Sequence, residues 1–280
     1  MKILITGAGG QLGQVLSQAL ASHEVHALLH AHLDITKLPA VRTVIETIEP
    51  HLIINTAAYN NVDGAEADPE AAYRGNALGP RNLALVSAAH GVPLLHVSTD
   101  YVFSGTGKRP YHEFDRTDPQ SVYGESKLAG EQAVKELNAR HFIVRTAWLY
   151  HIVGKNFPTT MIALARQQSA VRVVNDQRGS PTYVPHLVDA LIMLCQTNAY
   201  GTYHLVGQGA ATRYELTCRL YHQLNVETPV QPVATAEFPR AATRPAYSVL
   251  TTLQDPQLLL PPWEDGVVQF AAAIQRRSHS

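Results

Sequence analysis

Short apolar runs alternate with longer stretches of mixed polarity through the first half of the chain. Apolar runs of this length predict strands, and the stretches between them are long enough for crossover helices. The expected strands are Lys2–Ile5, Glu24–Leu29, Leu52–Ile54, Val92–Val97 and Phe142–Arg145, and the expected helices are Gln11–Ala21, Lys37–Ile48, Pro69–His90 and Val122–Leu137. The pattern therefore predicts an α/β fold with a Rossmann-type, doubly wound parallel sheet that is covered on both faces.

The rhythm changes after Trp148. Helices are expected at Phe157–Gln168, Pro185–Gln196, Tyr214–Leu224 and Trp263–Arg276, extended segments at Val171–Val174 and Thr202–Val206, and irregular, proline-rich chain from Thr228 to Pro262. We expect residues 1–150 to form an NAD(P)-binding domain. Residues 151–280 should form mainly a smaller C-terminal substrate-binding lobe, with some segments returning to the first domain.

Composition narrows the class of protein. The 280 residues are 45% hydrophobic and 16% charged, with a formal net charge of −1, so we expect no general affinity for nucleic acid or anionic membrane. Only Cys195 and Cys218 are present, too few for a disulfide framework. The apolar N-terminal stretch is too short for a signal peptide, and no run is long enough for a membrane helix. A cytoplasmic protein is expected.

A glycine-rich segment follows the first expected strand and opens the first helix. Gly7, Gly10 and Gly13 are spaced Gly-x-x-Gly-x-x-Gly, which differs from the usual Gly-x-Gly-x-x-Gly. The physics is the same, because glycine allows a tight turn and lets the backbone approach a pyrophosphate at a helix N-terminus. The segment predicts a dinucleotide site.

The second expected strand ends without the carboxylate that usually binds the cofactor ribose. The first acid after it is Asp34, and no arginine stands there either. A carboxylate would repel a 2′-phosphate, so its absence favours NADPH, with NADH still possible. His26, His30 and His32 match no standard metal-site spacing, and we expect no metal.

Candidate chemistry lies at the end of the fourth strand and on the helix that follows. Tyr123 and Lys127 are four residues apart and therefore share one helix face. The ammonium should lower the pKa of the phenol, which can then deliver a proton. Ser98 or Thr99, at the carboxyl end of the strand, can donate a hydrogen bond to a carbonyl oxygen. With a nicotinamide, these groups suit reduction of a ketone.

The chain resembles the extended short-chain dehydrogenases/reductases, and within them most closely the dTDP-4-dehydrorhamnose reductases. The motifs that carry the resemblance begin with the glycine loop and continue at residues 55–59, 62–66, 76–80, 98–103, 111–113, 123–131, 145–150, 175–182 and 244–250. The later motifs belong to the expected substrate lobe. The resemblance thus spans nearly the whole chain.

The resemblance implies NADPH-dependent reduction of the C4 keto group of dTDP-4-dehydro-β-L-rhamnose to dTDP-L-rhamnose. It implies catalytic roles for Thr99, Tyr123 and Lys127. The implied cofactor residues, besides Tyr123 and Lys127, are Gly7, Gly10, Gln11, Leu12, Gly13, Asp34, Ile35, Ala57, Ala58 and Tyr59. The implied sugar residues are Val62, Asp100, Tyr101 and Trp148, and Arg178 or Arg244 would pair with the substrate diphosphate.

Some positions depart from the family pattern. Thr56, Asn60 and Asn61 stand where relatives more often have alanine, threonine and alanine. The alternatives are therefore another nucleotide-diphospho-4-keto-6-deoxysugar, a non-catalytic NADP-binding regulatory subunit, or a sugar-nucleotide epimerase. Some relatives dimerise through magnesium held by glutamates, one of which corresponds to Val15 here. We expect a monomer, or a homodimer without a metal bridge.

Overall fold

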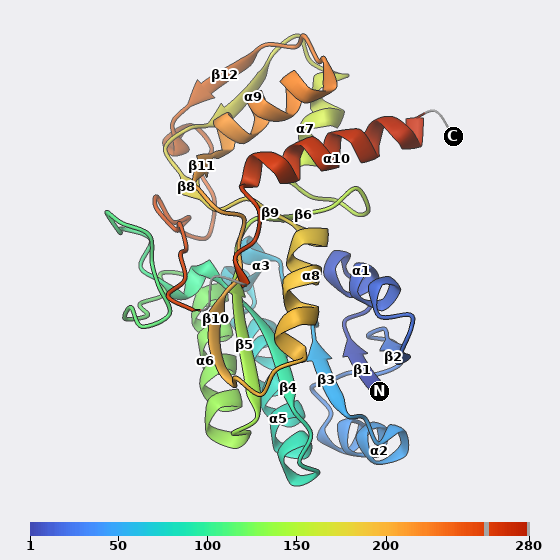
Figure 1. Cartoon of the computed structure of the whole chain (residues 1–280). Helices are drawn as coiled ribbons and strands as arrows, with labels where there is room; N and C mark the ends of the chain where they lie inside the picture. The colour runs from blue at the N-terminus through green and yellow to red at the C-terminus, as the bar shows by residue number, and fades with distance from the viewer. Residues whose placement is uncertain (255–257, 279–280) are drawn as a thin grey trace.

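A computed structural model of the chain describes residues 1–254 and 258–278. Six parallel strands form the central sheet in the order β10-β5-β4-β3-β1-β2 (Figure 1). Their bounds are β1 Lys2–Thr6, β2 Glu24–Leu28, β3 Leu52–Asn55, β4 Leu94–Thr99, β5 His141–Thr146 and β10 Gly201–His204. The predicted Rossmann-type doubly wound sheet is confirmed.

Helices cover both faces of this sheet. One face carries α1 (Gln11–Ala19) and α8 (Val184–Cys195), and the other carries α2 (Leu38–Ile48), α5 (Gly79–Ala89) and α6 (Val122–Leu137). Side chains alternate along a strand, so Ile3 and Ile5 join the first core whereas Leu4 joins the second. This alternation explains why the central strands are apolar at nearly every position. The edge strand β2 is the exception, since Glu24 and Ala27 are exposed.

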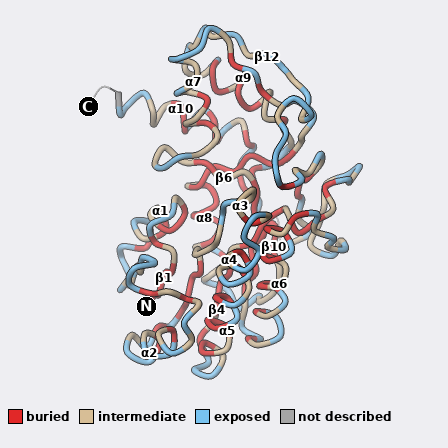
Figure 2. The backbone as a smooth tube through the Cα atoms, turned by 180° about the vertical axis from the view of Figure 1, so that it is seen from behind, coloured by how far each residue is buried: buried red, intermediate tan, exposed pale blue. Residues whose placement is uncertain are grey.

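Most of the other elements form a second body above the sheet, called here the upper lobe (Figures 1 and 2). It contains α7 (Phe157–Ala165), β7 (Val171–Val174), α9 (Arg213–Leu224), β12 (Val230–Val233) and α10 (Trp263–Ser278), with the short strands β6 (Leu149–Tyr150), β8 (Arg178–Gly179), β9 (Thr182–Tyr183) and β11 (Ala211–Thr212). A third apolar core holds it together, centred on Tyr150, Leu216 and Phe270. β10 belongs to the main sheet and α8 packs against it, although both follow residue 150. The division at residue 150 remains a prediction.

Two stretches differ from the sequence prediction. Pro69–His90 was expected as one helix but is α4 (Pro69–Tyr73), a π-helical turn η1 (Arg74–Leu78) and α5, preceded by α3 (Val62–Ala67). The π turn lets the buried Asn76 side chain bond the backbone N–H and carbonyl of Tyr59. β12 and a short 3-10 helix (Thr235–Glu237) lie in the stretch expected to be irregular, of which residues 255–257 fall outside the described chain.

None of the helices in the described ranges is both long enough and apolar enough to cross a membrane.

Gly130 sets how closely α6 can approach the π turn. A Cβ atom there would lie 2.0 Å from the carbonyl oxygen of Asn76. Glycine-to-alanine changes inside a helix usually stabilise by about 0.5–1 kcal/mol, but this contact is with backbone that cannot move aside. We expect Gly130→Ala to lower the free energy of unfolding by about 1–3 kcal/mol.

Urea unfolding followed by circular dichroism measures this change. The control is Gln132→Ala, an exposed position on the same helix, which should stay within about 0.5 kcal/mol of the parent. A Gly130→Ala protein as stable as the parent would contradict the close approach of α6 to η1.

Candidate active site and cofactor cleft

The glycine loop has the geometry of a dinucleotide turn. Gly7 adopts a φ of 71°, and a Cβ atom there would lie 2.4 Å from the backbone nitrogen of Ala57. A Cβ atom on Gly13 would lie 2.6 Å from the carbonyl oxygen of Gly7. Helix α1 begins after Gly10, and no described side chain caps its N-terminus. Its first N–H groups are therefore free to bind an anion.

Two cavities meet at this loop. One, of about 410 Å³, is lined by Gly10, Gln11, Leu12, Gly13, Thr56, Ala58, Asn60, Val62, Ser98, Thr99, Asp100, Tyr101, Tyr123, Lys127, Trp148 and Arg213, among others. The other, of about 610 Å³, is lined by Gly7, Asp34, Ile35, Ala57, Ala58, Tyr59, His30, Lys37 and Arg74, among others. The cofactor residues implied by the resemblance thus line one continuous cleft around the glycine loop.

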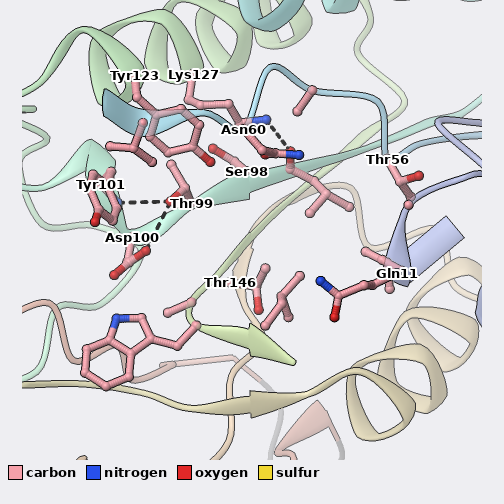
Figure 3. Close-up of a pocket in the computed structure, with 18 of the residues that line it drawn as sticks. Gln11, Thr56, Asn60, Ser98, Thr99, Asp100, Tyr101, Tyr123, Lys127 and Thr146 are labelled. Atoms are coloured by element: carbon pink, nitrogen blue, oxygen red, sulfur yellow. Dashed lines mark hydrogen bonds between the residues drawn. The ribbon is translucent and has the colours of Figure 1, made fainter. Parts of the chain in front are cut away.

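The Tyr-x-x-x-Lys pair lies on the wall of the smaller cavity. Ser121 caps α6 by accepting a hydrogen bond from Gly124 N at 3.2 Å, which fixes the start of the helix just before Tyr123. Tyr123 and Lys127 project from the same face of α6 toward the end of β4 (Figure 3). The Tyr123 ring meets the Tyr101 ring edge to face, with centroids 5.4 Å apart.

The electrostatics of this pair differ from the sequence expectation. Lys127 was expected to lower the pKa of Tyr123, but burial raises the pKa of this phenol well above its ordinary value, and the neighbouring Thr99 hydroxyl offsets only part of the rise. The Lys127 ammonium donates instead to the carbonyl oxygen of Val97, at 2.6 Å. Burial also lowers the pKa of Lys127 to about 8. The expected lowering for Tyr123 was therefore wrong for this arrangement.

Both candidate hydroxyls at the end of β4 line the smaller cavity, and each is hydrogen-bonded within the protein. The Ser98 hydroxyl donates to Glu131 Oε1 at 2.6 Å, inside the protein. The Thr99 hydroxyl donates to Asp100 Oδ1 at 3.1 Å and accepts from Tyr101 N at 3.2 Å (Figure 3). Burial raises the pKa of Asp100 to about 6, although Thr99 and Arg213 favour its charged form.

A third cavity, of about 480 Å³, continues from the cavity of about 410 Å³. It shares Tyr101, Trp148 and Arg213 with that cavity. Its other lining residues are mostly aromatic, aliphatic or cationic, and include Phe157, Met161, Arg172, Phe238, Arg240, Arg244 and Pro245. Several guanidinium groups beside aromatic rings suit a ligand that carries both phosphate and a planar base.

Trp148 is held in an unusual conformation between these cavities. Its φ is 49°, in the left-handed region that bulky residues rarely adopt. The Arg213 guanidinium lies 3.6 Å from the centre of one face of the indole, and Gly179 lies against it as well, since a Cβ there would come within 2.5 Å of the ring. Strained residues of this kind concentrate at binding sites.

Sequence reasoning missed Arg213. The sequence did indicate that Arg213 begins a helix, because Thr212 and Glu215 have the spacing of a capping box, and the structure shows Arg213 as the first residue of α9. A cation at the positive end of a helix is unfavourable unless an anion compensates it. Asp100 is such an anion, and it favours the charged form of Arg213, whose pKa burial lowers to about 10.

The two arginines proposed for the diphosphate lie in different places. Arg244 lines the third cavity and donates to Asp63 Oδ2 at 2.8 Å. Arg178 lies outside these three cavities, and its guanidinium pairs with Glu215 at 3.1 Å. The structure therefore brings Arg244 together with the other predicted residues and leaves Arg178 apart from them.

Comparison with known proteins identifies relatives with the same architecture. The chain matches the RmlD substrate binding domain family over residues 1–276. A dTDP-4-dehydrorhamnose reductase of Mycobacterium tuberculosis is 42% identical over 262 residues, covering 90% of this chain and 86% of the relative. A probable dTDP-4,6-dihydroxy-2-methyloxan-3-one 4-ketoreductase of Streptomyces antibioticus is 43% identical over 257 residues, covering 89% and 86%.

A solved structure agrees with these matches along nearly the whole fold. The dTDP-4-dehydrorhamnose reductase of Bacillus anthracis, in complex with NADP, is 42% identical with a TM-score of 0.93, covering 97% of this chain and 99% of that chain. Both the sequence match and the structural match extend from the glycine loop through the third cavity. The chain therefore belongs to the RmlD substrate binding domain family, together with the dTDP-4-dehydrorhamnose reductases.

Proposed function

We propose that this chain binds NADPH in the cleft around the glycine loop and reduces the C4 keto group of dTDP-4-dehydro-β-L-rhamnose to dTDP-L-rhamnose. The observation that carries the proposal is the convergence of Thr99, Tyr123 and Lys127 on a cavity that has the glycine loop as one wall. That cavity opens into the arginine-rich third cavity, which suits a nucleoside diphosphate.

The residues of the cleft fit the cofactor. The uncapped N-terminus of α1 leaves N–H groups for the pyrophosphate, and the missing side chains of Gly7 and Gly13 let the loop pack closely enough to present them. Asp34, Ile35 and Tyr59 line the adenosine part of the cleft. His30 and Lys37 lie there as well, and the positive charge of Lys37 suits a 2′-phosphate. When bound, NADPH supplies the hydride.

Reduction adds the hydride to C4 and a proton to the oxygen. Tyr123 is the proton donor, because it lies on the wall of the cavity beside Thr99 and its phenol holds its proton at neutral pH. Thr99 donates a hydrogen bond that polarises the carbonyl, after its hydroxyl turns from Asp100. Lys127 places a positive charge beside the anion that forms as Tyr123 loses its proton, after its ammonium turns from the carbonyl oxygen of Val97.

The third cavity holds the nucleoside diphosphate in this proposal. Arg213 and Arg244 bind the diphosphate, with Arg244 preferred over Arg178 because only Arg244 of the two lines the cavity. Trp148, Tyr101, Val62 and Asp100 surround the sugar where the two cavities join.

A second candidate keeps the chemistry and changes the sugar. Thr56 and Asn60 line the catalytic cavity at positions where the family pattern differs, and one or two such contacts can decide sugar preference. The 4-ketoreductase relative of Streptomyces antibioticus supports this alternative. Assays with several 4-keto sugar nucleotides in parallel separate the two.

Replacing Tyr123 by phenylalanine removes the proposed acid while keeping the ring. We expect kcat to fall by about 10²- to 10⁴-fold, because proton delivery is lost, with little change in NADPH affinity. NADPH oxidation at 340 nm measures turnover with dTDP-4-keto-6-deoxyglucose supplied beside a 3,5-epimerase. Tyr221→Phe is the matched control, since this buried tyrosine donates to Met161 O at 2.7 Å in the upper lobe. Equal losses in both variants would contradict an acid role.

The activity should depend on the charge of Lys127. With a pKa of about 8, the Lys127 side chain is charged below that pH and neutral above it. We therefore expect kcat/KM to fall as pH rises through about 8. In Lys127→Arg the side chain stays charged. The fall of kcat/KM at high pH, its alkaline limb, should therefore move above pH of about 10, even if the overall rate is lower. A limb that stays near pH 8 in this variant would assign it to another group.

Arg213 should contribute more to substrate affinity than Arg178. A charged hydrogen bond is worth about 1.5–3 kcal/mol, so Arg213→Met should raise KM for the sugar nucleotide about 10- to 100-fold. Arg178→Met should change it less than about threefold, since its partner Glu215 is half-exposed. Calorimetric titration with dTDP gives the same comparison without turnover, and a larger loss for Arg178→Met would reverse the assignment.

A further inference from the structure

Helix α6 holds two consecutive residues of β4. Lys127 Nζ donates to the carbonyl oxygen of Val97 at 2.6 Å, and the hydroxyl of Ser98 donates to Glu131 Oε1 at 2.6 Å. Lys127 and Glu131 are four residues apart on α6, so both bonds come from one face of the helix. The next residue of β4 is Thr99.

Glu131 is itself fixed from a third element. Arg145 of β5 donates to Glu131 through Nε at 2.9 Å and through Nη2 at 2.7 Å, a two-point contact. Arg145 stands opposite Ser98 in the parallel pairing of β5 with β4. All three side chains are buried, so the arrangement has little freedom to shift.

Stability alone gives a weak reason for this arrangement. Taking two charges out of water costs about as much as their attraction returns, and apolar residues of similar volume often serve equally well. The buried Glu131–Arg145 pair also binds the hydroxyl of Ser98, so it holds β4 in place. The part of β4 that it holds is the end beside the proposed catalytic residues.

We infer that Glu131 is a positioning residue, which through Ser98 holds the end of β4 so that Thr99 meets Tyr123 across the cavity. The inference rests on the proposed function, because it concerns the alignment of the two groups that act on the keto oxygen. It assigns Glu131 no contact with substrate or cofactor.

Glu131 also acts on Lys127 through its charge. Burial lowers the pKa of Lys127, whereas the carboxylate of Glu131 raises it. The other titratable neighbours are Tyr123, one turn earlier on α6, and His96 of β4, which burial keeps neutral by lowering its pKa well below the usual value. Arg145 and Lys135 face Glu131 and favour its charged form.

Ser98→Ala tests the link by removing only the hydroxyl, since Glu131 keeps both bonds from Arg145. We expect kcat to fall about tenfold or more through misplacement of Thr99, with KM changed less than threefold and NADPH affinity unchanged. Ser87→Ala is the matched control: Ser87 is fully buried and accepts from Asn138 at 2.8 Å, away from the cleft. Full kcat in Ser98→Ala, or an equal loss in Ser87→Ala, would overturn the inference.

Two further readouts separate positioning from general damage. Amide hydrogen exchange of residues 97–103 should be faster in Ser98→Ala than in Ser87→Ala, and equal exchange would overturn the inference whether or not the parent turns over this sugar. Parent protein without turnover would contradict the proposed function instead.

Glu131→Gln keeps an acceptor for Ser98 and removes the charge. The alkaline limb of kcat/KM should therefore move to lower pH than in the parent, whereas Ser98→Ala should leave the limb in place. An unmoved limb in Glu131→Gln would contradict the electrostatic part of the inference.

Discussion

The parallel register of the central strands is the constraint on which the site depends. β1, β3, β4 and β5 all run in one direction, so Thr6, Asn55, Thr99 and Thr146 end at the same edge of the sheet. The backbone hydrogen bonds that set this register involve no side chain. They nevertheless decide which side chains reach the cleft, because a shift of one residue would turn each of these side chains to the other face.

Buried polar side chains connect the strands at that edge. Thr6 donates to Asn55 Oδ1 at 2.7 Å, and Asn55 Nδ2 donates to His96 Nδ1 at 2.9 Å, so the contact crosses β1, β3 and β4. Asn55 Oδ1 also accepts from Ala57 N at 3.1 Å, which ties the loop beside the cofactor cleft to the sheet. Hydrogen bonds of this kind between buried side chains favour one arrangement of the core, although His96 Nε2 has no partner within the described residues. Buried hydrogen bonds within the sheet thus help to fix the shape of the cleft, in addition to the residues that line it.

The sequence predicted the parts of the site that depend on local spacing. Tyr123 and Lys127 share a helix face by periodicity alone, and the glycine loop follows directly from its position between a strand and a helix. Arg213 could not be predicted in this way. It lies on a helix more than a hundred residues after Thr99, and only the folding of the upper lobe brings both residues to the same cavity. The predicted direction of the Tyr123 pKa shift was wrong for a related reason. The shift depends on how deeply the phenol is buried, and tertiary packing sets that burial. The π turn at residues 74–78 likewise reflects the partners of Asn76 rather than any local preference.

The half-buried indole of Trp148 gives the cleft an intrinsic fluorophore. The chain has only two tryptophans, and the other, Trp263, is buried in the upper lobe. A guanidinium stacked on one face and a glycine backbone beside the ring place the Trp148 fluorophore in a polar, charged setting that any ligand joining the two cavities must alter. The fluorescence of Trp148 should therefore change when a ligand occupies the junction of the two cavities, so that binding can be followed without turnover.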